Sequence, residues 1–226
     1  MRATTLGIIC AAALSGTARA QESPVVVELF TSQGCSSCPP ADAFLTDLAH
    51  TRTNVLPLAF HVTYWDYLGW KDPYSLDAAT TRQRDYAKQI GADGIYTPQM
   101  VVDGTTGFVG SDRSRGLAAI GNATRKPVAL SLTRDGETLR VTVGAGSGQA
   151  RVLLVGFDRT RQTPIGRGEN SGRTLTESNI VRSFTSIGTW TGTTLSLHQP
   201  PPPGDSAAVL LQASDGRIIG AARLAS

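Results

Sequence analysis

The sequence predicts an α/β domain over residues 21–125, followed by an all-β antiparallel sandwich over residues 126–226. Two observations lead to this fold class. Over Pro24–Thr124, apolar runs typical of strands alternate with stretches at helical spacing, which is the layout of an α/β domain. After Lys126-Pro127, short β-prone runs are separated by Gly, Asp and Pro, as in antiparallel sandwiches.

In the first half we expect strands and helices in alternation. The continuous apolar run VVVELF, residues 25–30, indicates a strand buried on both faces. Residues 41–49 repeat apolar positions at helical spacing. The expected elements that follow are a strand over residues 54–62, a helix over 75–91 with Ser75 as N-cap, a hairpin turned at Asp103-Gly104 and a helix over 112–124.

The second half contains two strong hairpin signals, Asp135-Gly136 and Asp215-Gly216, each between apolar runs. QPPPPG, residues 199–204, is expected to be an exposed, extended loop. A group of polar residues in this half is expected to form a hydrogen-bond network between the two domains. Its members are Glu169, Asn170, Arg173, Asn179 and Arg182.

Residues 1–20 have the features of a signal peptide: a short positive start, an apolar stretch and the A-x-A cleavage form at Ala18–Ala20. Cleavage there predicts a periplasmic or secreted protein, in a compartment where disulfides persist. Removal of Arg2 and Arg19 leaves a net charge of about +1. This balance argues against nucleic acid and membrane surfaces as partners, because both need clustered Lys and Arg.

After cleavage the chain keeps two cysteines, Cys35 and Cys38, and three uses of the pair have to be weighed. A structural disulfide closing so short a loop gains only ~2 kcal/mol. A zinc site would need four ligands. Cu(I) could be held by the two thiolates and His61, although a hydrogen-bonded core histidine is the simpler interpretation of His61. The third use is a reactive pair.

The reactive interpretation fits the position of the pair at the start of a helix. Side chains at i and i+3 on a helical turn are neighbours, and Pro39-Pro40 fit the first turn, whose N–H groups have no intrahelical partner. The helix dipole stabilises a thiolate there. We therefore expect Cys35 to be the exposed, attacking thiol and Cys38 to resolve the mixed disulfide. Ser36 and Ser37 could cap the helix or donate hydrogen bonds to the Cys35 thiolate.

These residues resemble the active-site unit of thioredoxin-like proteins: strand VVVELF, a short turn, Cys-x-x-Cys and an amphipathic helix. In IYTPQMVVDG, Thr97-Pro98 is similar to the cis-proline loop of that family. Tyr64–Ala87 would then be a helical insert. Gly34 departs from the family, which usually has tryptophan before the first cysteine. The resemblance also implies a role for Glu28, a buried acid that would take a proton from the resolving cysteine.

Most of the chain is also similar to a family of secreted bacterial proteins of unknown function (domain of unknown function 1223). The segments that carry the similarity are ELFTSQGCSSCPPAD, FHVTYWDYLGWKDPY, RQRDYA, YTPQMVVDG and RGENSGRTLTESNIVRSF. That resemblance implies a thioredoxin-like N-terminal domain and says little about substrate.

The sequence therefore predicts an exported thiol–disulfide oxidoreductase that needs no cofactor. Its partners would be a thiol- or disulfide-bearing substrate and a redox protein. Two alternatives stay open: a Cu(I)-binding protein that uses His61, and a binding module with a structural disulfide. The expected catalytic residues are Cys35, Cys38, Glu28 and Pro98, and the expected substrate-binding residues are Thr97, Gly34, Ser36, Ser37 and Trp65.

Overall fold

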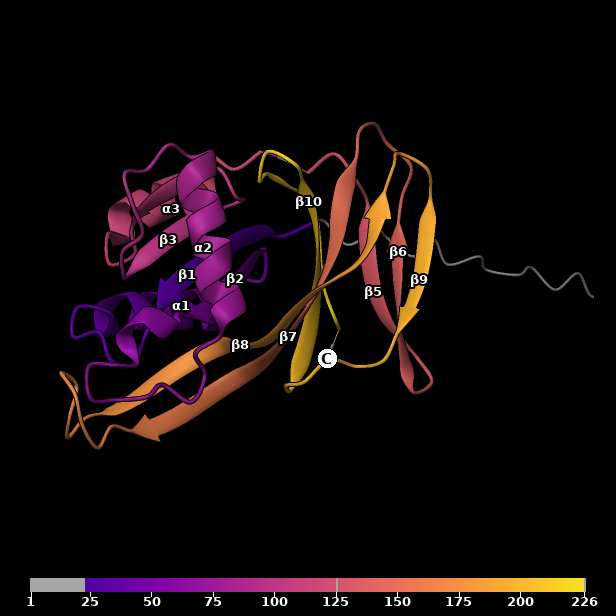
Figure 1. Ribbon diagram of the computed structural model, residues 1–226. Coiled ribbons are helices and arrows are strands. Elements are labelled where there is room, and N and C mark those ends of the chain that lie inside the picture. The colour runs from indigo at the N-terminus through magenta and orange to yellow at the C-terminus, as the bar shows by residue number, and fades with distance from the viewer. Residues whose placement is uncertain (1–22, 125, 226) are drawn as a thin grey trace, which may run out of the picture.

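The structure is a computed structural model that describes residues 23–124 and 126–225 (Figure 1). The expected signal peptide lies outside these residues. The helices are α1 (Pro39–Thr51), η1 (Thr63–Trp65, a 3-10 turn), α2 (Asp77–Gln89) and α3 (Arg113–Gly121). The strands are β1 (Val25–Thr31), β2 (Val55–His61), β3 (Gln99–Val102), β4 (Thr106–Val109), β5 (Leu130–Asp135), β6 (Thr138–Val143), β7 (Ala150–Pro164), β8 (Thr174–Trp190), β9 (Leu195–Gln199), β10 (Ser206–Ala213) and β11 (Ile218–Arg223).

Eight of these strands form one mixed sheet, in the order β11-β10-β7-β8-β2-β1-β3-β4. β1 and β2 run parallel over their whole length, β3 lies antiparallel to β1, and β4 lies antiparallel to β3. β8 joins β2 through a single parallel pair, Ala59 with Ile180, and lies antiparallel to β7. β5, β6 and β9 form a separate three-stranded sheet, which Figure 1 shows at the end of the molecule away from the helices.

The predicted fold class, a thioredoxin-like domain with a helical insert followed by a separate antiparallel sandwich, is wrong. Strands from both sides of residue 125 belong to one sheet. The expected insert, Tyr64–Ala87, holds most of α2 and an irregular stretch in place of a compact helical unit. Only the three short strands β5, β6 and β9 stand apart from the large sheet.

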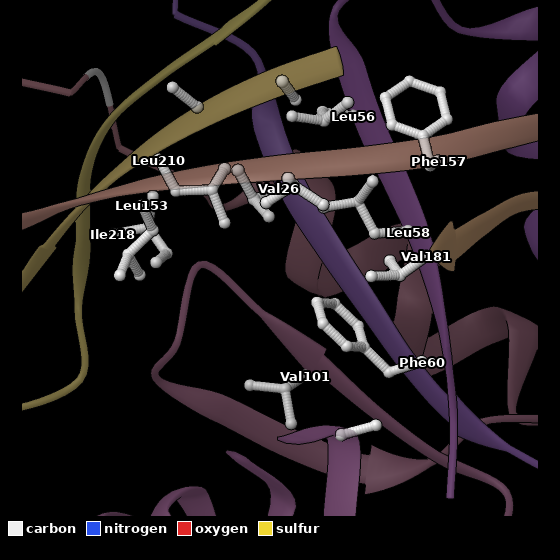
Figure 2. Packing of buried hydrophobic residues seen from close by; sticks show 14 of the residues in the cluster. Val26, Leu56, Leu58, Phe60, Val101, Leu153, Phe157, Val181, Leu210 and Ile218 are labelled. Atoms are coloured by element: carbon white, nitrogen blue, oxygen red, sulfur yellow. The ribbon is translucent and has the colours of Figure 1, made fainter. Parts of the chain in front are cut away.

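The physical reason is that the central strands are apolar on both faces. In β10, Val209 and Leu211 pack into a core with the three-stranded sheet. Leu210, between them, packs into a core shared with Val26 and Leu56 of the first half, and Figure 2 shows these three side chains together. Such a strand needs a covering layer on each side, so the two halves of the chain share its burial.

Several local predictions are confirmed. The hairpin turn at Asp103-Gly104 joins β3 to β4, with φ of 47° and 73° at the two residues. The two later Asp-Gly turns join β5 to β6 and β10 to β11. α3 begins after Asp112, whose side chain accepts a hydrogen bond from the Arg115 N–H. Helix α2 starts after Leu76, so Ser75 is not its N-cap.

Helices α1 and α3 cover one face of β1, β2 and β3, and α2 covers the other face. Val27 and Leu29 of β1 pack against α1. Val26 and Phe30 point to the opposite face. This alternation decides which side chains of β1 can approach the cysteine pair. Among the described residues, no helix has the length and apolar character needed to span a bilayer.

Candidate functional site

The loop between β1 and α1, residues 32–38, carries the cysteine pair and is called the Cys loop below. Cys35 and Cys38 form a disulfide, with their Cα atoms 5.4 Å apart. Cys38 is the N-cap residue of α1, and the helix starts with two prolines. The backbone N–H of Cys38 donates to the Cys35 carbonyl, 3.2 Å away. The pair therefore lies at the start of the helix, as predicted.

Neither cysteine is exposed. Both side chains are 0% accessible to solvent, so the expectation that Cys35 lies at an exposed edge is wrong. The neighbouring Ser36 and Ser37 are exposed. The Ser37 hydroxyl lies 3.3 Å from the Cys35 sulfur, within reach of a weak hydrogen bond. Ser37 can thus donate to a Cys35 thiolate once the disulfide opens.

Thr97-Pro98 lies beside the Cys loop. Its peptide bond is cis, as the sequence predicted. The Trp65 ring N–H donates to the Thr97 hydroxyl, 2.7 Å away, and a Cβ added to Gly34 would meet the Trp65 Cβ at 3.3 Å. Trp65 therefore connects the Cys loop to the proline loop. The structure brings together all five residues expected to bind substrate or to line this side of the site: Gly34, Ser36, Ser37, Trp65 and Thr97.

Glu28 does not lie with the cysteines. Its carboxylate forms an ion pair of 2.7 Å with Arg82 of α2 and accepts from the Tyr86 hydroxyl. Glu28 shares the face of β1 that carries Val26, whereas the cysteine-bearing helix lies on the other face. Its buried charge is neutralised by Arg82, and the expected proton transfer with Cys38 does not fit this position.

A different set of ionisable side chains lies behind the Cys loop, and we call it the His61 cluster: Asp42, His61, Asp72 and Glu177. Each is at most 6% exposed. His61 Nδ1 lies 2.7 Å from an Asp72 oxygen, and His61 Nε2 lies 3.7 Å from a Glu177 oxygen. Asp42 accepts a hydrogen bond of 2.7 Å from the Thr31 hydroxyl. The cluster draws on α1, β2, β8 and the loop before α2.

Gln33 ties the Cys loop to this cluster. Its backbone N–H donates to Asp72 at 2.8 Å, and its side-chain amide donates to Glu177 at 2.6 Å. The Trp70 ring N–H donates to the Gln33 side-chain oxygen at 3.1 Å. Gln33 precedes Cys35 by two residues, so a change in the cluster's charge acts directly on the backbone that holds the disulfide.

Burial and mutual repulsion determine the protonation of the cluster. Burial, and next the charge of Glu177, raise the pKa of Asp42 from 3.8 to about 8. Burial alone would lower the pKa of His61, but Asp72 and Glu177 outweigh it and raise that pKa from 6.5 to about 9. Burial also raises the pKa of Glu177. At neutral pH, Asp42 therefore carries a proton and His61 is a cation.

Three buried atoms of the cluster have no hydrogen-bond partner among the described residues: Asp42 Oδ2, His61 Nε2 and Glu177 Oε1. Buried polar atoms are rarely left unpaired, and exceptions gather where protons move or ligands bind. Asp42 follows Cys38 by one helical turn, so the two side chains share a helix face. Asp42 therefore offers a protonated carboxyl on the helix face that also carries Cys38.

Copper binding by Cys35, Cys38 and His61 stays a prediction, because both sulfur atoms lie in the disulfide here. His61 Nδ1 is occupied by Asp72. Across the described residues, no group of three or more His, Cys, Asp and Glu side chains is arranged to hold a metal ion.

The polar group of the second half does connect the two halves. Asn170 donates to the carbonyls of Gln33 and Cys35, and Asn179 donates to the Pro57 carbonyl. Arg182 instead pairs within the second half, with Asp158. The expected network is therefore present: Arg182 also lies over the Tyr74 ring of the first half at 5.2 Å, and Arg173 supports Asn170 from within the hairpin.

Sequence reasoning missed four residues of the site: Gln33, Asp42, Asp72 and Glu177. Asp42 in CPPAD had a usable signal, because it lies one helical turn after Cys38 and would be charged at a position facing the core. Glu177 had none, since it approaches the loop only through the long β7–β8 hairpin (Figure 1).

Comparison with known proteins gives one family model and two solved structures. Residues 26–212 match a family model described as a protein of unknown function, DUF1223. The crystal structure of protein AGR_C_4864 from Agrobacterium tumefaciens is 32% identical, with a TM-score of 0.77, and the match covers 91% of this chain and 96% of that one. HBP35 of Porphyromonas gingivalis is 15% identical, with a TM-score of 0.57 over 89% of this chain and 74% of that one, a likeness of fold alone. No curated protein matches the chain.

Proposed function

Since the chain belongs to the DUF1223 family, whose function is unknown, we propose from the site itself that the protein is a thiol–disulfide oxidoreductase. In this proposal the Cys35–Cys38 pair exchanges its disulfide with a thiol- or disulfide-bearing partner. No metal or organic cofactor is needed, because the electrons reside in the sulfur atoms.

The observation that carries the proposal is the proton-holding cluster behind the disulfide. A bridge that spans a separation of three residues stabilises the fold by only ~2 kcal/mol. Burying several ionisable side chains that are incompletely hydrogen-bonded costs more free energy than this bridge supplies, which indicates that the cluster does not serve stability alone. Strongly shifted pKa values beside a potential nucleophile are typical of catalytic sites. The raised pKa of Asp42, one helical turn from Cys38, fits this description.

In the proposed reaction, a partner thiolate attacks Cys35, and the bond between Cys35 and Cys38 breaks. The electron pair of that bond stays on Cys38, which takes the proton from Asp42. A second partner thiolate then attacks the partner sulfur of the mixed disulfide and releases Cys35 as a thiolate, which Ser37 can stabilise by its hydroxyl. The partner leaves as a disulfide, and the reverse sequence reduces it. Asp42 accepts the proton again when Cys38 becomes the attacking thiolate.

The test is the reduction potential of the Cys35–Cys38 couple, measured in glutathione redox buffers with the two thiols quantified by alkylation and mass spectrometry. Catalytic pairs of this kind lie between about −270 and −120 mV, while structural disulfides lie below about −300 mV. We expect a value in the first range. A value below about −300 mV would contradict the proposal.

A second candidate function is a binding module in which the disulfide only braces the Cys loop. The observation that favours it is the complete burial of both sulfur atoms. The same potential measurement decides between the two, because a buried, purely structural bridge resists reduction by glutathione.

The proposal includes export to an oxidising compartment, based on the signal-peptide pattern of residues 1–20. Expression of the full chain, cell fractionation and N-terminal sequencing test it. A mature protein beginning near Gln21 and recovered outside the cytosol is expected.

A further inference from the structure

The tip of the β7–β8 hairpin, residues 165–173, lies on the Cys loop although more than 130 residues separate them in sequence. The Asn170 side-chain amide donates to two carbonyls, those of Gln33 and Cys35, each 2.9 Å away. The Glu169 carboxylate accepts from the backbone N–H of Ser36 at 3.0 Å. Asn170 is 1% exposed. The hairpin tip is therefore bonded to the backbone on both sides of Cys35.

The tip has a fixed shape that presents these groups. The Ile165 N–H donates to the Arg173 carbonyl at 2.8 Å, which closes the loop at its base. Arg173 also donates to the Asn170 side-chain oxygen at 3.1 Å, so the Asn170 NH₂ group faces the Cys loop. Gly168 has a φ of 78°, and a Cβ there would meet the Trp70 side chain at 3.1 Å. Trp70 thus contacts the tip and, through its ring N–H, also bonds to Gln33 of the Cys loop.

In this closed arrangement neither cysteine sulfur is accessible. Thiol–disulfide exchange requires a partner sulfur to approach the disulfide directly. Because the tip is bonded to the backbone around Cys35 and comes from a distant part of the chain, its displacement would free the backbone groups beside the disulfide.

The groups of the Cys loop that the tip bonds are main-chain groups, which a bound peptide could bond in place of the tip. Gln33 and Cys35 offer two carbonyl acceptors, and Ser36 offers an N–H donor. A peptide in extended conformation exposes its own N–H and C=O groups and can bond these three groups, which gives affinity without sequence specificity. Asn170 occupies the place of two peptide N–H groups, and Glu169 that of a peptide carbonyl.

We propose that the hairpin tip is a displaceable plug that occupies the binding place of an extended, cysteine-bearing polypeptide segment. The substrate class is then a protein thiol or disulfide in an unfolded or extended region, and small free thiols are poor substrates because they cannot displace the plug. The substrate class in this inference rests on the proposed redox function. The displaceable tip does not depend on that function, because it concerns only the fold.

The experiment compares Asn170→Ala with Ser171→Ala, a matched control in the same loop. Ser171 is exposed, and its hydroxyl makes one hydrogen bond of 3.3 Å within the tip. The first readout is the second-order rate of disulfide reduction by a small phosphine. Loss of two buried hydrogen bonds should raise this rate at least tenfold in Asn170→Ala, and Ser171→Ala should stay within twofold of the wild type. Glu169→Ala, a change at an exposed side chain that leaves the core intact, should raise the rate about threefold.

The second readout compares an extended peptide dithiol with dithiothreitol as reductant of the wild type. The peptide should reduce the wild-type disulfide at least tenfold faster than dithiothreitol does. In Asn170→Ala this ratio of rates should be smaller, because the substitution accelerates the reaction with dithiothreitol more than the reaction with the peptide. A phosphine rate within twofold of the wild type in both Asn170→Ala and Glu169→Ala would overturn the plug. Equal wild-type rates with the two dithiols would overturn the substrate class. A reduction potential below about −300 mV would instead refute the redox function, and the phosphine rates would still decide whether the tip is a plug.

Discussion

Replacing Asp42 by Asn tests the protonation of the His61 cluster. An acid whose pKa is raised in the folded state favours folding below its ordinary pKa, and that contribution is lost as the pH rises through the raised value. For Asp42 this window extends from 3.8 to about 8. Asparagine has no charge to acquire and can keep the acceptor for the Thr31 hydroxyl. It therefore mimics the protonated carboxyl at every pH.

The magnitude follows from the shift. Each pKa unit corresponds to ~1.4 kcal/mol, so the wild type loses on the order of 6 kcal/mol relative to Asp42→Asn once the carboxyl is fully ionised. Between pH 5 and pH 7.5, the difference in unfolding free energy, variant minus wild type, should rise by about 3 kcal/mol. Comparing two pH values cancels any constant cost of the substitution.

The assay is urea unfolding of the oxidised proteins, followed by tryptophan fluorescence at pH 5 and 7.5. The control is Asp47→Asn, which changes a carboxylate about half exposed on the same helix. Between the two pH values, its difference in unfolding free energy from the wild type should change by less than about 0.5 kcal/mol, because solvent screens the Asp47 charge. A rise below about 1 kcal/mol for Asp42→Asn would refute a buried, protonated Asp42. The proton donor of the proposed reaction would then be lost as well.

Three further outcomes are expected. Glu28→Gln should lower the unfolding free energy by about 3–5 kcal/mol, because it leaves Arg82 buried without its carboxylate partner. The rate at which iodoacetamide labels the reduced cysteines should change less than twofold. A larger change in this rate would place Glu28 in the exchange reaction. His61→Gln should lower the unfolding free energy by about 3 kcal/mol more at pH 6 than at pH 9.5. The protonated His61 stabilises the fold fully below pH 6.5, and this contribution is lost as the pH rises through about 9. Equal losses of unfolding free energy at the two pH values, measured by denaturant titration, would contradict a cationic histidine. Cys38→Ser should accumulate mixed disulfides through Cys35 on non-reducing gels, whereas Cys35→Ser should accumulate none, and the opposite pattern would reverse their roles.

The sequence predicted the local elements better than their assembly. Strand and hairpin positions follow from apolar runs and Asp-Gly turns, which depend on neighbouring residues only. The single sheet could have been anticipated from AAVLLQ in β10, whose six residues are all buried. A continuous apolar run of this kind indicates layers on both faces, whereas the outer strand of a sandwich alternates. The pairing of β8 with β2 could not be inferred, because it consists of one residue pair.

The candidate site was predicted where the chemistry is local and missed where it depends on the side of a strand. The cysteine pair and the Thr97-Pro98 bond follow from adjacent residues. Glu28 was expected beside Cys38, but neighbouring strand residues point to opposite faces, and Val27 and Leu29 are the ones that face α1. In the proposed reaction, Asp42 of α1 takes the role that was expected of Glu28, from the face of β1 that α1 covers.

The first and last strands of the fold meet. The Ser23 hydroxyl donates to the Ala221 carbonyl at 2.8 Å, and the Ala221 N–H donates back to the Ser23 oxygen. A chain is synthesised from its N-terminus. The segment that leads into β1 is therefore made long before β11, with which it forms these hydrogen bonds. The cysteines emerge three residues apart and can be oxidised long before residues 165–173 exist. The nascent chain would thus carry an uncovered disulfide, open to reagents in its surroundings, until residues 165–173 have been made and have folded onto the Cys loop.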